Sequence, residues 1–198
     1  MTSKVTDRVK YKGKNYELIG SSRGELLFNI FKYGLNPAMM HTGCYRGFYC
    51  GYELHHAGFT AIKKEMPTLN ITTYAGMSRI IEYFTHLEGM GVYAPLEERR
   101  KDNALNNDRD YTALFDKKLM KEYETQYFAI YSKFINSPDK ELAADDWNFL
   151  SEMSDGKRLW YTVGAMMAEK IDRTSGREHL VSLIAQPSEN FIKEYRRE

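Results

Sequence analysis

The sequence contains only two cysteines, Cys44 and Cys50, among its 198 residues. Two cysteines cannot form the disulfide framework of a small secreted domain, so we expect both to be reduced, half-buried packing residues. No stretch approaches the roughly 18 consecutive apolar residues that a membrane span needs. The N-terminal residues also lack the apolar segment of a signal peptide. These absences predict a soluble, cytoplasmic protein with no membrane partner.

The sequence also has no excess of either charge. Its 28 lysines and arginines balance 27 aspartates and glutamates, which leaves a formal net charge of +1. Such a chain has no overall field that would attract nucleic acid or an anionic surface. We therefore expect no nucleic-acid partner, and charge indicates no other partner either.

Aromatic residues, by contrast, are abundant, with 15 tyrosines and 10 phenylalanines. They predict a core and a pocket lined by aromatic rings, whose buried tyrosine hydroxyls need hydrogen-bond partners. A chain of 198 residues is long enough for one domain with a full core. We expect a single domain over residues 1–198, in which residues 1–20 form an arm or a small β-hairpin.

Helical periodicity and capping signals dominate the rest of the chain and predict a mainly α fold, a single-domain helical bundle. Ser22 and Glu25, for example, have the spacing of a capping box at the start of a helix. The polar run over residues 97–110 is expected to be a surface loop. Further helices are expected over residues 111–135, 145–153, 159–172 and 178–185, and from Pro187 onward.

One predicted helix begins at a cap formed by Thr72 or Thr73 and runs to about Glu88. Apolar residues such as Met77 and Ile81 recur at helical spacing along it, and Glu88 falls on the same stripe. We therefore expect the Glu88 side chain on the buried side of the helix, where an unpaired carboxylate is costly.

Residues 38–66 admit two interpretations. As a helix, they place Phe48, Tyr52, His56 and Phe59 along one stripe, and three glycines recur at intervals of four residues. As a β-hairpin, they would gain from their aromatic content, and each interior glycine costs a helix about 1 kcal/mol. We favour the helix because both the apolar stripe and the glycine spacing keep the helical period.

The same segment contains the sequence YELHH, from Tyr52 to His56. In the H-E-x-x-H motif of zinc peptidases, two histidines on one helix face bind the metal, and the glutamate activates a water molecule. Here Tyr52 takes the first histidine position, Glu53 the glutamate position and His56 the second histidine position. Glu53 and His56 also have the spacing of the E-x-x-H half-motif found in di-iron bundles. Such a bundle needs a second E-x-x-H motif, which the sequence does not contain.

Together with Glu88 in HLEGMGVYAP, this stretch resembles the gluzincin type of zinc peptidase, in which a glutamate from a second helix completes the metal site. Residues 159–195 resemble the closing helices of uncharacterised prokaryotic relatives, so the resemblance covers roughly residues 45 to 197. It implies His56 and Glu88 as zinc ligands, Tyr52 in the remaining ligand position and Glu53 as the general base.

Two residues near the start of a C-terminal helix, Arg158 and Tyr161, are candidates for stabilising an oxyanion if they point into the pocket. Tyr161 is the one we assign to the catalytic group. The alternatives are packing for Tyr161 and a surface charge for Arg158.

Tyr52 departs from the zinc-peptidase pattern. The pKa of a phenol is about 10, against about 6.5 for imidazole, so a metal must displace a proton to bind it at neutral pH. We therefore expect weak zinc binding and weak or absent peptide-bond hydrolysis. One alternative is a non-catalytic domain that binds a peptide or small molecule in a degenerate metal pocket. Another is a structural domain, in which Glu53 pairs with Arg46 or Lys63 and Glu88 bonds to tyrosine hydroxyls.

Overall fold

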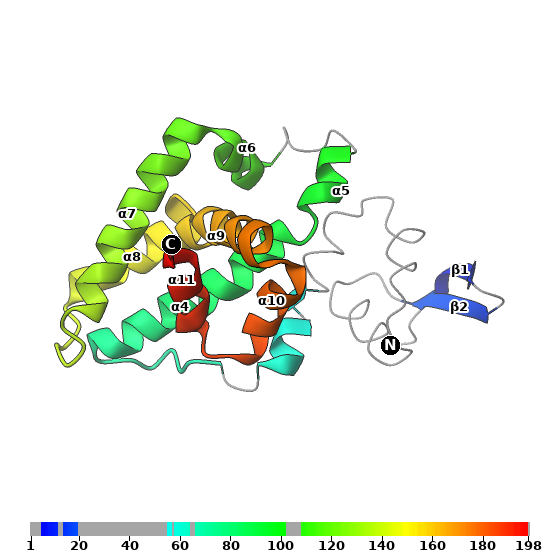
Figure 1. Cartoon of the computed structure of the whole chain (residues 1–198). Coiled ribbons are helices and arrows are strands. Elements are labelled where there is room, and N and C mark those ends of the chain that lie inside the picture. Colours follow the sequence, from blue (N-terminus) through cyan, green and yellow to red (C-terminus); the bar gives the residue numbers. More distant parts are fainter. Residues whose placement is uncertain are drawn as a thin grey trace.

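The computed structural model describes residues 5–11, 14–19, 55–56, 58–63, 66–101 and 108–197. Within these ranges the protein is mainly helical, which confirms the predicted fold class. Figure 1 shows the helices packed together, with α4 and α9 crossing in the middle of the group. No helix in the described ranges is both long and apolar enough to cross a membrane.

The N-terminal strands form a β-hairpin. Strand β1 (Val5–Tyr11) pairs antiparallel with β2 (Lys14–Ile19), and Val9 lies opposite Tyr16. The hairpin predicted within residues 1–20 is therefore confirmed. The helices expected after Ser22, and both cysteines, lie outside the described residues.

Helix α4 (Tyr74–Tyr93) is the central helix of the fold. Thr73 caps it, because its extended backbone directs the hydroxyl toward the amide of Gly76. Almost all of its residues are buried, including Glu88, as the apolar stripe predicted. The predicted end near Glu88 is wrong, since the helix continues for more than another turn.

The helix continues because Gly89 is a packing residue and not a terminator. A Cβ atom placed on Gly89 would lie only 2.4 Å from the backbone of Gly164 in α9 (Leu159–Ser175). A Cβ placed on Gly164 would lie 2.5 Å from the carbonyl oxygen of Thr85. The two glycines therefore let the backbones of α4 and α9 approach each other closely.

In its described part, the polar run over residues 97–110 is not the surface loop that we predicted. Helix α5 (Leu96–Lys101) contains part of it, and α6 (Arg109–Phe115) begins before its end. The Arg99 side chain is buried: its guanidinium lies 4.2 Å from the centre of the Tyr111 ring and 3.2 Å from Asp108. These contacts with α6 hold the polar segment against the core.

The helix predicted over residues 111–135 is two helices. Asp116 ends α6 and caps α7 (Lys117–Ile135) by accepting hydrogen bonds from the amides of Lys118 and Leu119. Phe134, near the end of α7, is fully buried in the core.

The C-terminal part follows the predicted order of elements. A short 3-10 turn (Ala144–Asp146) leads into α8 (Trp147–Ser151) and a π-helical turn (Glu152–Gly156), which precede α9. Gly176, with φ of 88°, ends α9 as expected. Helix α10 (Arg177–Ser182), a 3-10 turn (Leu183–Ala185) and α11 (Ser188–Arg196) follow, and Pro187 precedes the last helix.

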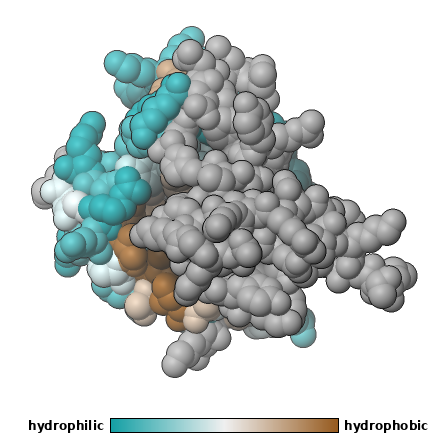
Figure 2. Space-filling model, turned by 90° about the vertical axis from the view of Figure 1, so that its right-hand side faces the viewer, coloured by the Kyte–Doolittle hydropathy of each residue, from teal (hydrophilic) through white to brown (hydrophobic). Residues whose placement is uncertain are grey.

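Buried tyrosine hydroxyls have the partners that the sequence analysis required. The Tyr111 hydroxyl donates to the carbonyl oxygen of Val92 at 2.6 Å, and the Tyr131 hydroxyl donates to Glu82 at 2.7 Å. On the face that Figure 2 shows, apolar surface gathers in one area beside hydrophilic residues.

Candidate metal centre

The described part of the motif segment is helical. Residues 55, 56 and 58–62 form a helix that lies against α4, so the helical interpretation is confirmed for these residues. Tyr52 and Glu53 lie outside the described residues, and their assigned roles stay predictions.

Phe59 anchors this helix in the core. Its side chain is fully buried. Its ring makes T-shaped contacts with the rings of Tyr83 and His86, at 5.7 and 4.9 Å between ring centres. His55 adds a polar contact, because its Nε2 atom lies 3.0 Å from the carbonyl oxygen of Leu87. His55 therefore packs against α4.

The anchored helix brings His56 to Glu88. His56 Nε2 and Glu88 Oε2 lie 3.0 Å apart, although the two atoms are not aligned for a hydrogen bond. The Glu88 side chain is 10% exposed and that of His56 is 23% exposed. Two residues that are 32 positions apart in the sequence thus converge in a largely buried location.

The two neighbouring histidines are neutral at pH 7. Burial, and to a lesser degree the nearby His56, lowers the pKa of His55 to about 4. Burial also holds the pKa of His86 well below its usual range, with Lys63 and His55 acting in the same direction. Neutral rings beside His56 and Glu88 add no positive charge that would repel a cation.

Tyr161 lies within electrostatic reach of Glu88. Burial raises its pKa, and the negative charge of Glu88 raises it further, so the phenol keeps its proton at neutral pH. The Arg158 guanidinium stacks on the Tyr161 ring at 3.5 Å from the ring centre. A proton donor is therefore available on the α9 side of the site, whereas its catalytic role stays a prediction.

Asp110 fixes the position of Arg158. Its carboxylate accepts two hydrogen bonds from the Arg158 guanidinium, at 2.6 and 2.7 Å, and the residue itself is buried. Asp110 was not among the predicted site residues, because it lies at the end of the run that was expected to be a surface loop. The sequence around Asp110 has no feature that indicates its distant partner.

The donor chemistry of His56 and Glu88 fits a zinc ion. Two ligands that each lie about 2.0–2.1 Å from a tetrahedral zinc are about 3.3 Å apart, close to the observed separation. Catalytic zinc sites use three protein ligands. The described ranges contain no cluster of three or more His, Cys, Asp or Glu residues that could hold a metal.

Comparison with known proteins bears on this arrangement. A family model with the description "Putative zinc dependent peptidase (DUF5700)" matches residues 49–197. The chain belongs to this family. The DUF5700 match includes both helices of the site, with the YELHH stretch and Glu88, and it extends through α11. No curated protein and no solved structure matches the chain.

Membership of DUF5700 shows that the protein is zinc-peptidase-like, and it makes zinc a plausible cofactor. The family description does not extend to the gluzincin arrangement of ligands, the effect of Tyr52 or the level of activity.

Proposed function

We propose that this protein holds a zinc ion weakly through His56, Glu88 and Tyr52, in a gluzincin-like arrangement, and is at most a slow peptidase. The observation that carries the proposal is the approach of His56 Nε2 to Glu88 Oε2, at 3.0 Å, from two separate helices. The family description supports the metal and the reaction class. The tyrosine at the first ligand position supports weak binding.

In this proposal each side chain has one task. Zinc, when bound, would polarise the scissile carbonyl of a peptide and acidify a water molecule. Glu53 accepts the proton that this water releases and passes it to the leaving amine. Tyr161 keeps its own proton and donates a hydrogen bond to the carbonyl oxygen as negative charge develops there. Arg158 holds the Tyr161 ring in place by stacking on it.

Tyr52 limits this chemistry because it supplies a weakly acidic phenol where an imidazole would bind without losing a proton at pH 7. Residues four apart on a helix lie on one face, so position 52 should face the same space as His56. Replacing Tyr52 by His should complete a His-His-Glu set of ligands.

The test is a calorimetric zinc titration of the untagged wild-type chain and of Tyr52→His. Loss of a partner that merely orients a ligand costs about 10 to 100-fold in metal affinity. A new direct ligand should therefore raise zinc affinity by at least about tenfold. The added affinity should disappear in the double variant Tyr52→His/Glu88→Gln.

A matched control separates this site from adventitious binding. Tyr123→His introduces the same imidazole on α7, outside the two helices of the site, and should leave zinc affinity unchanged. Equal affinity of wild type and Tyr52→His would contradict the proposal. So would a gain in the Tyr52→His variant that persists after Glu88→Gln.

A second candidate function is non-catalytic binding of a peptide or small molecule in the same place. The direct contact between His56 and Glu88 favours it, because the two side chains satisfy each other's charge when His56 is protonated. In that case zinc would not protect the protein against thermal unfolding, whereas zinc bound to the folded state raises the unfolding temperature by an amount that grows with the logarithm of the zinc concentration divided by its Kd.

A further inference from the structure

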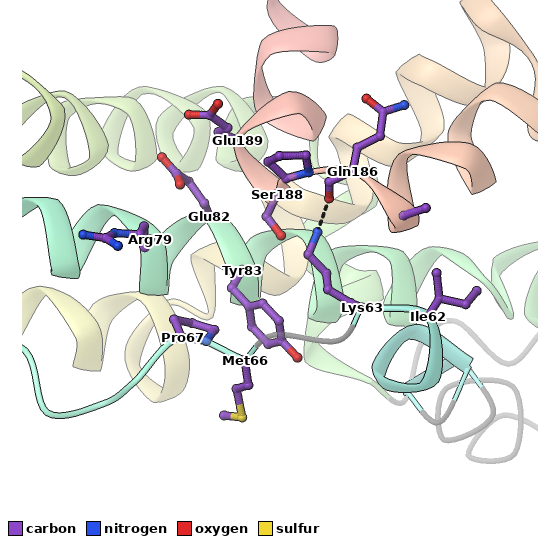
Figure 3. Close-up of a pocket in the computed structure, with 12 residues that line it drawn as sticks. Ile62, Lys63, Met66, Pro67, Arg79, Glu82, Tyr83, Gln186, Ser188 and Glu189 are labelled. Carbon is purple, nitrogen blue, oxygen red and sulfur yellow. Dashed lines mark hydrogen bonds between the residues drawn. The ribbon is translucent and has the colours of Figure 1, made fainter.

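A second cavity lies beside the candidate metal centre and does not include His56 or Glu88. It has a volume of about 740 Å³, within the usual range of small-molecule sites. Three parts of the chain line it: residues 62–63 and 66–67, the first half of α4, and residues 185–189 at the start of α11 (Figure 3). Its chemistry differs from one side to the other.

One side of the cavity is rich in hydrogen-bond donors. The Lys63 Nζ atom donates to the carbonyl oxygen of Gln186 at 2.5 Å, and an ammonium group retains further donors after one such bond. Burial lowers the pKa of Lys63 to about 8, so the group is still mainly charged at pH 7. A partly desolvated cation of this kind gains from an anionic partner.

Ser188 adds a second donor at the same side. The residue is only 9% exposed, and its hydroxyl makes no hydrogen bond within the part of the chain that the structure describes. A buried hydroxyl without a partner is costly. Figure 3 shows the Ser188 hydroxyl and the Lys63 ammonium pointing into the same space.

The first turn of α11 contributes there as well. Pro187 precedes this helix and provides no side-chain cap, so the Ser188 and Glu189 amides have no capping side chain, whereas the Asn190 amide donates to the Pro187 carbonyl oxygen at 2.9 Å. The amino end of a helix favours negative charge. The Lys63 ammonium, the Ser188 hydroxyl and this helix end therefore favour the same kind of group.

The two acidic residues of the cavity are already engaged elsewhere. Glu82 accepts a hydrogen bond from Tyr131, and Glu189 forms an ion pair with Lys193 at 2.9 Å. In Figure 3 both carboxylates point away from the Lys63 ammonium. The donor side therefore keeps its positive character.

The rest of the lining is apolar and accessible. Ile62 and Met66 are 48% and 58% exposed, and the ring of Tyr83, which lies beside Met66 in Figure 3, also lines the cavity. Apolar side chains exposed next to a polar anchor are typical of a site for an amphipathic small molecule.

We propose that this cavity binds the carboxylate of an apolar molecule. The carboxylate accepts hydrogen bonds from Lys63, Ser188 and the first turn of α11, and the apolar chain lies on Ile62 and Met66. Two sources share this chemistry: a free aliphatic acid and the C-terminal carboxylate of a short apolar peptide. The proposal does not depend on the zinc site.

The test is a calorimetric titration of the full chain at pH 7 with EDTA present, so that no probe can coordinate a metal. Hexanoate and the tripeptide acetyl-Ala-Ala-Leu with a free carboxylate represent the two sources. Hexanamide and the amidated tripeptide have the same shapes without the charge. We expect at least one acid to bind and its neutral partner to bind at least about tenfold more weakly, because hydrogen bonds to charged groups are the stronger ones. The acid that binds more tightly identifies the source.

Variants assign the binding to this cavity. Lys63→Met should weaken binding of the acid by at least about tenfold, Ser188→Ala should weaken it by several fold, and Lys63→Arg should retain most of it. Lys118→Met, which removes an exposed lysine on α7, and Glu88→Gln, at the candidate metal site, should change nothing. Circular dichroism checks that each variant is folded.

Four results would overturn the proposal. The first is that neither acid binds, and the second is that an acid and its neutral partner bind equally. The third is that binding survives both Lys63→Met and Ser188→Ala. The fourth is that only Glu88→Gln abolishes binding, which would show that the ligand binds at the candidate metal site instead. None of these results bears on the zinc titration, so the two proposals fail separately.

Discussion

Replacement of Gly164 by alanine tests whether the close approach of α4 and α9 determines the stability of the fold. A Cβ atom at this position would lie 2.5 Å from the Thr85 carbonyl oxygen and 2.8 Å from the Gly89 Cα. Both are backbone atoms, which cannot rotate away as a side chain would. The helices must therefore move apart, and the packing along their shared face is lost.

The magnitude follows from two opposing effects. Overpacking a tight interior costs about 1–3 kcal/mol, while alanine in place of glycine favours a helix by about 1 kcal/mol. Because the obstructing atoms belong to the backbone, we place the steric cost at the upper end of its range. The net loss is then about 1–2 kcal/mol, which corresponds to a fall in unfolding temperature of about 2–8 °C for a chain of this size.

Gly58→Ala is the matched control. Gly58 is also helical, but among the described residues no atom outside its own helix backbone and its chain neighbours lies within 4 Å of the position that its Cβ would take. This substitution should raise stability by about 0.5–1 kcal/mol. Urea unfolding followed by circular dichroism measures both changes. If Gly164→Ala is as stable as the wild type, or if both variants lose stability equally, the close helix contact does not have the importance that we assign to it.

Three further predictions concern single carboxylates. Burial raises the pKa of Glu82, despite a hydrogen bond from Tyr131. The folded state therefore loses stability as the pH rises above about 4.5 and this group ionises. Glu82→Gln should stabilise the protein at pH 7 and have little effect at pH 4 in thermal unfolding scans. Asp110→Asn should cost about 3 kcal/mol in urea unfolding, because it leaves the partly buried Arg158 without its charge partner; a loss below 0.5 kcal/mol would show that the pair is not structural. Zinc-loaded wild type should cleave a peptide library slowly or not at all, and any chelator-sensitive cleavage that survives Glu53→Gln would refute the general-base assignment.

Local patterns in the sequence were sufficient to predict one half of the candidate site. The helical stripe through Met77 and Ile81 placed Glu88 on the buried side of its helix, and that is where the structure has it. The same reasoning predicted a helix for the segment that contains His56. Such predictions succeed because helix faces follow from a period that involves only neighbouring residues.

Features that depend on distant partners could not be predicted in the same way. Gly89 looks like a helix terminator unless one knows that Gly164 lies against it, 75 positions later in the chain. Arg99 and Asp110 look like loop residues because charge in a polar run is usually exposed. Arg99 is buried against the Tyr111 ring, and Asp110 is buried with Arg158. Neither contact has a local signature.

The anchoring of the motif helix has an evolutionary consequence. Phe59 holds this helix by hydrocarbon packing in the core, three residues beyond His56, and that packing does not depend on the protonation or occupancy of the ligand positions. A substitution at position 56 therefore leaves this anchor in place, although it removes the contact with the buried Glu88 carboxylate. Lineages that share this scaffold can change the residue at this position while Phe59 keeps the helix packed on the core.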